Sequence, residues 1–354
     1  MTVDHPALAQ RFARFAQVEC RGSSPLYEAL SWSIAGDDDM LDLAAHAAPG
    51  QPVPNLFFAA VHFVLARAPD APLAEFYPSL TAAARPPGEA YPSLRTFCRD
   101  HAAAIRSLLE SRRVQTNEVG RCAYLFPAFT LVGQLAGDRP LALIEIGASA
   151  GLNLLWDRYG YRYDETAVCG PSDSPVRIRC QLRGDLRPPL VRMPPAIADR
   201  IGVDLHPVDV DDDDAVRWLE ALVWPEARER VDLLRAAIAL ARREPRRLVS
   251  GDGAVVLAAT FDAMPPDMPV CVFHTHTLNQ VSPEARAQFT ALLGELAATR
   301  ELYRISAEWL GAPVPQLTLT TWSRGQAHER LLARCDHHGR WLEWLDRLGA
   351  VEHP

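Results

Sequence analysis

The chain has 354 residues and a formal net charge of −8, and 48% of its residues are hydrophobic. The length suggests two domains or one large domain with an appendage, and the hydrophobic content is enough for a sizeable core. The negative charge argues against general nucleic-acid binding, and abundant arginine does not by itself indicate a phosphate site, because the chain has no lysine.

The cysteines and the apolar stretches bear on the cellular compartment. Seven cysteines are scattered without a C-x-x-C pair, a pattern that favours reduced thiols in a cytoplasm. The first residues lack the basic and apolar regions of a signal peptide. The longest apolar stretch, residues 56–66, is interrupted by His62 and is too short to span a bilayer. We therefore expect a cytoplasmic protein without a membrane partner.

Residues 1–135 are predicted to form an all-α domain. Apolar residues recur at helical spacing from Leu8 to Val18. Residues 56–65 are apolar on all sides, which is typical of a buried helix, and His62 within them is interpreted as a hydrogen-bonded core histidine. No run in this part has the alternation of a strand, and we expect the domain to cap an active site.

A polar segment, QTNEVGR at residues 115–121, comes just before the helix that leads into the first strand. If the segment is helical, Arg113, Asn117 and Arg121 lie on one face. Two interpretations stay open. Asn117, Glu118 and Arg121 line the crevice of a small-molecule substrate, or they form an ordinary polar face with a capping role for Asn117.

The stretch from Leu141 to Leu155, LALIEIGASAGLNLL, gives the strongest indication of function. It predicts a buried strand that ends at Glu145, a tight turn from Gly147 to Gly151, and a helix that begins at Leu152. In this layout, N–H groups at the helix start can receive an anion or a polar ligand edge. Small residues in the turn let a ligand come close to the main chain.

Residues 136–354 alternate between predicted strands and helices, with an inserted segment at about 159–200. The apolar runs that predict further strands are residues 201–209, 247–250, 270–273 and 302–306, and an exposed arginine face marks an alternating strand at 176–183. Residues 316–322 and 330–335 predict a hairpin joined through Gly325. The fold class is therefore α/β, with a doubly wound, mostly parallel sheet and a C-terminal antiparallel hairpin after the all-α domain.

Two chemistries fit the turn. Read as G-x-S-x-G, it is a nucleophile elbow with Ser149 as the attacking group of a serine hydrolase. Such an elbow follows several earlier strands of its sheet, whereas here the strand before the turn is the first one. That order favours a cofactor turn. A non-catalytic nucleotide- or cofactor-binding protein is the third class that fits.

Read as E-x-G-x-S-x-G, the same stretch resembles motif I of class I S-adenosylmethionine-dependent methyltransferases, which have a Rossmann-like sheet. The resemblance implies S-adenosylmethionine as the cofactor, acting on a small-molecule acceptor. The residues that it places at this cofactor in the turn are Glu145, Gly147, Ala148, Ser149 and Gly151.

The resemblance also places acids at the ends of the next two strands. Asp204 resembles the family's ribose-binding acid, and Asp252 with Gly253 resembles the position that meets the adenine amine. The separation of Gly147 and Asp204 is 57 residues, against a usual spacing of about 20. Either the inserted segment explains this difference, or Asp164 is the ribose acid at ordinary spacing.

The segment from His274 to Asn279 follows the fourth strand, where the resemblance places residues that face the reacting methyl group. Histidine titrates near neutrality, so it can accept a proton from an acceptor hydroxyl or amine. We expect His274 nearest the cofactor, His276 as the general base and Asn279 orienting the substrate. A metal enzyme is a fourth class, because His274 and His276 share a face if the strand continues, with His206 or Asp209 as a candidate third ligand, but we expect no metal ion.

Over its whole length, the chain is identified as a member of the bacterial family of the domain of unknown function 2332. The stretches that carry this resemblance are GSSPLYE at 22–28, PNLFFAAVHF at 54–63, QTNEVGR at 115–121, IEIGASAGLNLLWDRYGYRY at 144–163 and VFHTHTLNQ at 272–280. The family implies no established activity, so the reaction stays open.

Overall fold

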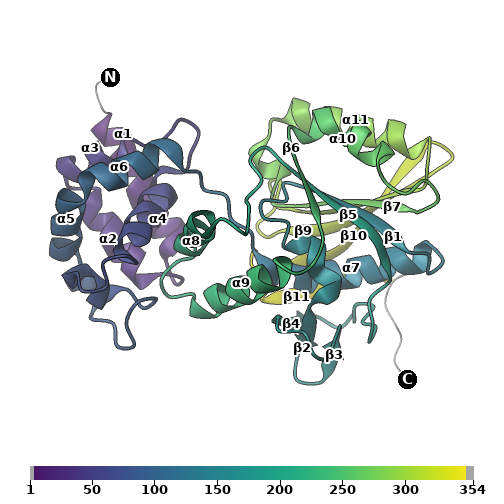
Figure 1. Cartoon of the computed structure of the whole chain (residues 1–354), viewed down its shortest axis with the longest axis horizontal. Coiled ribbons are helices and arrows are strands. Elements are labelled where there is room, and N and C mark those ends of the chain that lie inside the picture. The colour runs from purple at the N-terminus through teal and green to yellow at the C-terminus, as the bar shows by residue number, and fades with distance from the viewer. Residues whose placement is uncertain (1–3, 348–354) are drawn as a thin grey trace. The chain divides into compact units, whose positions relative to one another are not determined.

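The computed structural model describes residues 4–347, which form two compact units (Figure 1). One unit comprises the chain up to Thr116 together with Asp212–Asp232. The other comprises Asn117–Asp211 and the chain from Leu233 onward. Residues 117–135 thus belong with the sheet and residues 212–232 with the helices, so these units differ from the ranges expected from the sequence.

The regular elements of the first unit are helical throughout its described residues. They are α1 (His5–Arg14), η1 (Phe15–Cys20), α2 (Pro25–Ile34), α3 (Asp38–Ala44), α4 (Val53–Leu65), η2 (Pro72–Phe76), η3 (Pro87–Glu89), α5 (Tyr91–Asp100), α6 (Ala102–Ser111) and α8 (Asp213–Ala221). Helix α4 is buried at 11 of its 13 positions, as its apolar sequence predicts. Within residues 4–347, no helix is both long enough and apolar enough to cross a bilayer.

His62 on α4 is a bonded core histidine, as predicted. Its Nδ1 lies 3.2 Å from the Ala221 carbonyl oxygen and its Nε2 lies 2.8 Å from the Ser79 hydroxyl. Burial lowers the pKa of His62 to about 4. In the folded unit His62 therefore stays neutral at pH values where the same histidine in the unfolded chain, with a pKa of about 6.5, is protonated.

We expect the free energy of unfolding to fall by roughly 3 kcal/mol as the pH drops from about 6.5 to 4, because protonation of His62 favours the unfolded state in this window. Urea unfolding of the wild type and of His62→Gln, at several pH values between 4 and 7.5, measures this slope. His46→Gln, which changes a partly exposed histidine of the same unit, should keep the wild-type slope. An equally steep slope in His62→Gln would place the titrating group elsewhere.

The second unit is built on an 11-stranded sheet with the order β3-β2-β4-β11-β10-β9-β8-β7-β1-β5-β6. Its strands are β1 (Leu141–Ile146), β2 (Gly160–Tyr163), β3 (Ala167–Cys169), β4 (Arg177–Arg183), β5 (Ile197–Asp204), β6 (Arg247–Ser250), β7 (Val270–Thr275), β8 (Leu302–Glu308), β9 (Gln316–Ser323), β10 (Gln326–Cys335) and β11 (Trp341–Trp344). Its helices are η4 (Val119–Arg121), α7 (Cys122–Leu135), η5 (Asn153–Arg158), α10 (Gly253–Asp262), η6 (Leu278–Gln280) and α11 (Pro283–Ala297), and α9 (Arg228–Ala241) begins in the helical unit and ends in this one.

The parallel part of the sheet runs β6-β5-β1-β7-β8. Strand order reverses at β1, because the chain first continues outward to β5 and β6 and later returns to β7 on the other side. Parallel strands end at the same edge of a sheet, so the turns after β1, β5, β6, β7 and β8 gather there. The predicted mixed α/β architecture with a large, mostly parallel sheet is confirmed, and β9 with β10 forms the predicted antiparallel hairpin.

The inserted segment extends the opposite end of the sheet. Strand β4 pairs with β11 and β2 pairs with β4, both in parallel, and the exposed arginine face of β4 follows its predicted alternation. Asp164 lies in the turn between β2 and β3, where its side chain accepts a hydrogen bond of 2.8 Å from the Leu182 N–H. Six strands separate β2 from β1. The alternative that Asp164 is the ribose acid at the β1 turn is therefore wrong.

The two faces of β1 meet different helices. Ala142, Ile144 and Ile146 pack in one core with residues of α10 and α11. The alternate positions, which include Glu145, face the side of α7 and η5, where the side-chain amide of Asn153 bonds Glu145 and the rings of Phe129 and Phe273 lie 5.1 Å apart. Figure 1 shows α10 and α11 together over one side of this sheet.

The predicted helix after the turn is wrong, because the structure has only the short 3₁₀ segment η5 there. Side-chain donors form hydrogen bonds with backbone carbonyl groups that would accept from backbone N–H groups in an α-helix. The hydroxyl of Tyr159 donates to the Leu152 carbonyl (2.6 Å), the hydroxyl of Tyr161 to Trp156 (2.5 Å), and the Arg200 guanidinium to Leu154 (3.0 Å). The chain then enters β2 at Gly160.

Candidate functional site

The turn between β1 and η5 has left-handed backbone at three positions, with φ of 75° at Gly147, 52° at Ser149 and 69° at Gly151. A Cβ atom at Gly147 would lie 2.3 Å from the Thr277 Oγ1 atom, and one at Gly151 would lie 2.9 Å from a methyl carbon of Leu248. The two glycines therefore leave room for the side chains of Thr277 and Leu248. The expectation that they leave room for a ligand is not supported at these two positions.

Five of the six N–H groups at residues 147–152 are used within the described protein, and that of Ala150 is the exception. Gly147 and Ala148 donate to the Val203 carbonyl (2.8 and 3.2 Å), and Ser149 donates to the Asp204 carboxylate (2.8 Å). Gly151 donates to the Ala148 carbonyl and Leu152 donates to the Asn117 side chain. The expectation that this turn offers N–H groups to an anion is therefore corrected, and η5 is too short to supply a helix start.

Glu145 is the polar group that the fold leaves unused at the turn. It is 1% exposed, and one carboxyl oxygen accepts a hydrogen bond of 3.3 Å from Asn153. The other oxygen, Oε2, is buried and makes no hydrogen bond. Burial raises the pKa of Glu145 well above its ordinary value, and the neighbouring Asp204 charge adds to the rise. A buried polar atom without a partner is costly, which points to a ligand donor at this oxygen.

Ser149 is 2% exposed, and its hydroxyl also makes no hydrogen bond. We expect Ser149→Ala to leave the free energy of unfolding within about 0.5 kcal/mol of the wild type, because the substitution removes no bond of the protein. Binding of a ligand that uses this hydroxyl should weaken about fivefold, the equivalent of ~1 kcal/mol for one neutral hydrogen bond. Calorimetric titration with S-adenosylhomocysteine measures the second effect, and unchanged affinity would remove Ser149 from the site.

Asp204 ends β5 beside this turn. Its two carboxylate oxygens accept hydrogen bonds from the N–H groups of Ser149 and His206, both 2.8 Å long. Leu205, the next residue, is 61% exposed. Asp252 caps α10 by accepting from the Ala254 N–H (2.8 Å), and a Cβ atom at Gly253 would lie 2.9 Å from the Ile146 side chain. The sheet thus brings the two predicted acids to the same edge as Glu145.

The predicted substrate triplet also lies in this unit. The chain before η4 is extended, so its members do not share a helix face. Asn117 accepts the Leu152 N–H (3.1 Å) and thereby supports the turn, and Glu118 accepts the Gly120 N–H (3.3 Å) and caps η4. Arg121 differs from these two residues, because it reaches the end of β7, where its Nη1 lies 3.4 Å from the Thr275 carbonyl oxygen.

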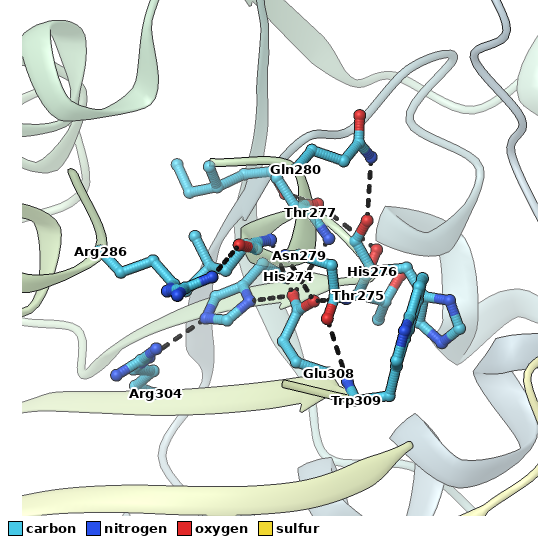
Figure 2. A network of polar contacts seen from close by, with 12 residues as sticks. His274, Thr275, His276, Thr277, Asn279, Gln280, Arg286, Arg304, Glu308 and Trp309 are labelled. Carbon is cyan, nitrogen blue, oxygen red and sulfur yellow. Dashed lines mark hydrogen bonds and ion pairs between the residues drawn. The ribbon is translucent and has the colours of Figure 1, made fainter. Parts of the chain in front are cut away.

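His274 belongs to a closed polar network centred on Glu308 (Figure 2). It is fully buried, and its Nδ1 lies 2.7 Å from the Glu308 carboxylate while its Nε2 accepts from Arg304 (3.1 Å). Burial lowers the pKa of His274. Burial opposes ionisation of Glu308, but hydrogen bonds from His274 and from backbone N–H groups outweigh it and hold the pKa of Glu308 below its ordinary value.

The same carboxylate builds the loop after β7. It accepts the N–H groups of Thr277 (3.0 Å), Leu278 (3.2 Å) and Asn279 (3.4 Å), and the Asn279 amide as well. The Asn279 side-chain oxygen accepts the Trp309 N–H (3.3 Å). His274 and Asn279 therefore have bonded roles inside the fold, which do not favour the predicted contacts of these residues with cofactor and substrate.

His276 is placed differently. It has a left-handed backbone (φ 57°) and is 8% exposed, and its Nε2 is buried without a hydrogen bond. Its ring packs on Trp309 at 4.6 Å and on His337 at 5.3 Å. Burial lowers the pKa of His276, and the positive charge of Arg121 adds to the effect. The imidazole is therefore neutral at physiological pH, the state that can accept a proton.

A family model matches residues 9–344 of this chain, and its description is "Uncharacterized protein conserved in bacteria (DUF2332)". The chain belongs to the DUF2332 family. No curated protein sequence matches the chain. The predicted family membership is therefore confirmed.

This DUF2332 protein has two hollows, of which the second borders the β1 turn, because Val208 in its lining donates a hydrogen bond of 3.1 Å to the Ser149 carbonyl. One, of about 670 Å³, lies in the inserted segment between residues 163–170 and 187–192, and the other, of about 430 Å³, lies between residues 207–211 and 241–248. Neither is lined by Glu145, Ser149, Asp204, Asp252 or His276, whereas Asp164, the alternative ribose acid, lines the first. Within residues 4–347, no three His, Cys, Asp or Glu side chains gather as metal ligands would, and all seven cysteines are buried free thiols.

Sequence reasoning missed Glu308, Trp309 and His337. Glu308 had a usable signal, since it is an acid at the end of an apolar strand, as Glu145 is. Trp309 and His337 meet His276 only through the pairing of β7 with β8 and the turn between β10 and β11. These contacts are non-local and leave no local pattern.

Proposed function

We propose that this protein is an S-adenosylmethionine-dependent methyltransferase whose cofactor lies over the turn after β1. The observation that carries the proposal is the buried Glu145 carboxyl group, which has one oxygen without a partner in the described chain, at a turn where all N–H groups of residues 147–152 except that of Ala150 are occupied. Such a site suits a ligand with hydrogen-bond donors or positive charge and does not suit a phosphate. S-adenosylmethionine has an amino group, ribose hydroxyls and a sulfonium, and no phosphate.

The strand order supports the same proposal. Numbered along the chain, the parallel strands run 3-2-1-4-5, and sheets of this kind bind ligands beyond the carboxyl ends of the strands where the order reverses. We infer a Rossmann-like methyltransferase sheet with an all-α N-terminal domain. Glu145 would hold the amino group, Asp204 the ribose hydroxyls and Asp252 the adenine amine, with the exposed Leu205 beside the adenine.

The cofactor supplies an activated methyl group, so the protein has to orient the acceptor and take up its proton. His276 is the candidate for the second task on geometry, because its buried Nε2 has no partner in the described chain, and an acceptor bound there would have to offset the effect of burial on its basicity. With an acceptor in hand, His276→Ala should lower turnover by ~10² and leave S-adenosylhomocysteine affinity within about twofold. Full turnover in His276→Ala would move the base elsewhere, first to Glu118.

A serine hydrolase is the alternative, and the left-handed Ser149 at the end of a strand is the feature that favours it. Against it, the Ser149 hydroxyl makes no hydrogen bond to any histidine in the described chain, although a nucleophile needs a base within reach. A fluorophosphonate probe separates the two proposals. Labelling of Ser149 would support the hydrolase, and we expect no labelling.

A ligand panel tests the methyltransferase proposal against a non-catalytic nucleotide-binding protein. We expect S-adenosylhomocysteine to raise Tm, with a stabilisation of about 2.7 kcal/mol at a concentration of 100 times Kd. ATP and NAD should give no shift, because a phosphate at the turn would find only the Ala150 N–H unbonded and would lie beside the Asp204 carboxylate. Stabilisation by ATP or NAD without stabilisation by S-adenosylhomocysteine would overturn the proposal.

A further inference from the structure

The guanidinium of Arg121 is anchored beside His276 on the α7 side of the sheet. Its Nε donates to the His337 carbonyl (3.2 Å), and its Nη1 lies 3.4 and 3.5 Å from the carbonyl and hydroxyl oxygens of Thr275. These partners come from two separate segments, the end of β7 and the turn between β10 and β11. Arg121 is therefore held in one place, and its Nη2 donors are left over.

Within the described chain, Arg121 forms no ion pair with a carboxylate. The acids around it are engaged otherwise: Asp336 bonds Arg340, and Glu118 caps η4. The pKa of Glu145 is raised by burial, which favours its neutral form. Arg121 is half-buried, and a partly desolvated guanidinium without a carboxylate partner in the described chain can bind an anion through its Nη2 atom.

Three aromatic rings lie beside this cation. His276, Trp309 and His337 pack edge to face, with centroids 4.6 to 5.3 Å apart. His276 is only 8% exposed, and its Nε2 atom has no hydrogen-bond partner in the described chain. Trp309 is 36% exposed. Figure 2 shows Trp309 and His276 next to each other at the end of the Glu308 network. An exposed indole beside a buried acceptor atom and an anchored guanidinium with no carboxylate partner in residues 4–347 suits a flat, anionic molecule.

We propose that Arg121, His276 and Trp309 form the acceptor site, and that the acceptor carries an oxyanion group bound by Arg121. A hydroxyl or amine of the same molecule faces the His276 Nε2 atom, and its flat part lies on Trp309. The identification of the ligand as a methyl acceptor rests on the proposed function. The anion site itself does not, because it needs no cofactor.

Salicylate and its neutral analogue 2-hydroxybenzyl alcohol test the site in the full-length protein without cofactor. Saturation-transfer NMR titrations should show that the wild type binds salicylate at least tenfold more tightly, because only salicylate offers a charged partner to Arg121. Phenyl phosphate against phenol forms the second arm and distinguishes a phosphate from a carboxylate. Equal affinity within both pairs would overturn the proposal.

Arg121→Gln should abolish the preference for the anion, and Arg179→Gln, which changes an exposed arginine of β4, should keep it. A preference that persists in Arg121→Gln would also overturn the proposal. If Arg121→Gln does not fold, the wild-type comparison decides alone. Titration with S-adenosylhomocysteine separates the two proposals, since anion preference without binding of this compound would leave the site standing and remove the methyltransferase.

Discussion

Glu145→Gln is expected to weaken S-adenosylhomocysteine binding by about 10- to 100-fold, because it removes the acidic partner of the ligand's charged amino group, and a hydrogen bond to a charged group is worth roughly 1.5–3 kcal/mol. The same substitution should raise Tm at neutral pH. Burial raises the pKa of Glu145 in the folded protein, so the stability contribution of this group is lost as the pH rises through the folded pKa. Glutamine does not ionise, so the variant does not lose stability in this way as the pH rises. A substitution that raises stability and weakens binding is typical of a residue at a functional site.

The gain in Tm should be small at pH 4.5, where the folded carboxyl group is protonated and the unfolded one is only about half ionised, and larger at pH 8. Calorimetric titration and thermal unfolding on the same samples measure both effects. Glu295→Gln, which changes an exposed carboxylate on α11, should alter neither. Unchanged affinity in Glu145→Gln would remove this carboxyl group from the proposed cofactor site.

Arg200→Met is expected to cost about 3 kcal/mol in the free energy of unfolding. The Arg200 guanidinium makes a bidentate pair with Asp157 at 2.7 and 3.1 Å, and each side chain is only 9% exposed. It also donates to the Leu154 carbonyl at 3.0 Å, so it ties η5 to β5. Removal of one partner leaves a buried charge and a buried carbonyl without their main donor. Arg158, at 3.4 Å from Asp157, is half-exposed and offers only partial compensation.

Urea unfolding followed by circular dichroism measures this loss. Arg247→Met is the matched control on the neighbouring strand β6, because the pair of Arg247 with Asp199 is largely exposed and should contribute at most about 1 kcal/mol. Arg200→Met combined with Asp157→Leu should recover part of the loss, since no buried charge then remains. Equal losses of stability in Arg200→Met and Arg247→Met would contradict a larger contribution from the buried Arg200–Asp157 pair.

Much of the sheet could be predicted because its strands carry local patterns. The apolar run that ends at Glu145 is buried at every position of β1, and the alternation at residues 177–183 appears as alternating burial in β4. Gly325, with φ of 76°, joins the predicted hairpin. The apolar pattern after Leu152 predicts a helix, whereas the hydroxyl groups of Tyr159 and Tyr161 and the guanidinium of Arg200 take the carbonyl groups there. The Arg200 contact comes from β5 and leaves no local signal.

The candidate site could be predicted only in part. The positions of Glu145 and Asp204 followed from strand ends, and the structure places both at one edge of the sheet. The difference between His274 and His276 could not be read from HTHT, because it depends on Glu308, 34 residues away from His274. The glycines of the turn were predicted to admit a ligand, whereas Thr277 and Leu248 fill the space beside them.

Calorimetric titration of the purified wild-type protein with S-adenosylhomocysteine at pH 7.5 tests the central claim most directly. The proposed role of Glu145, Ser149 and Asp204 at the turn predicts one site per chain with a Kd near the micromolar range, roughly −8 kcal/mol. Absence of binding at millimolar ligand would contradict the methyltransferase proposal.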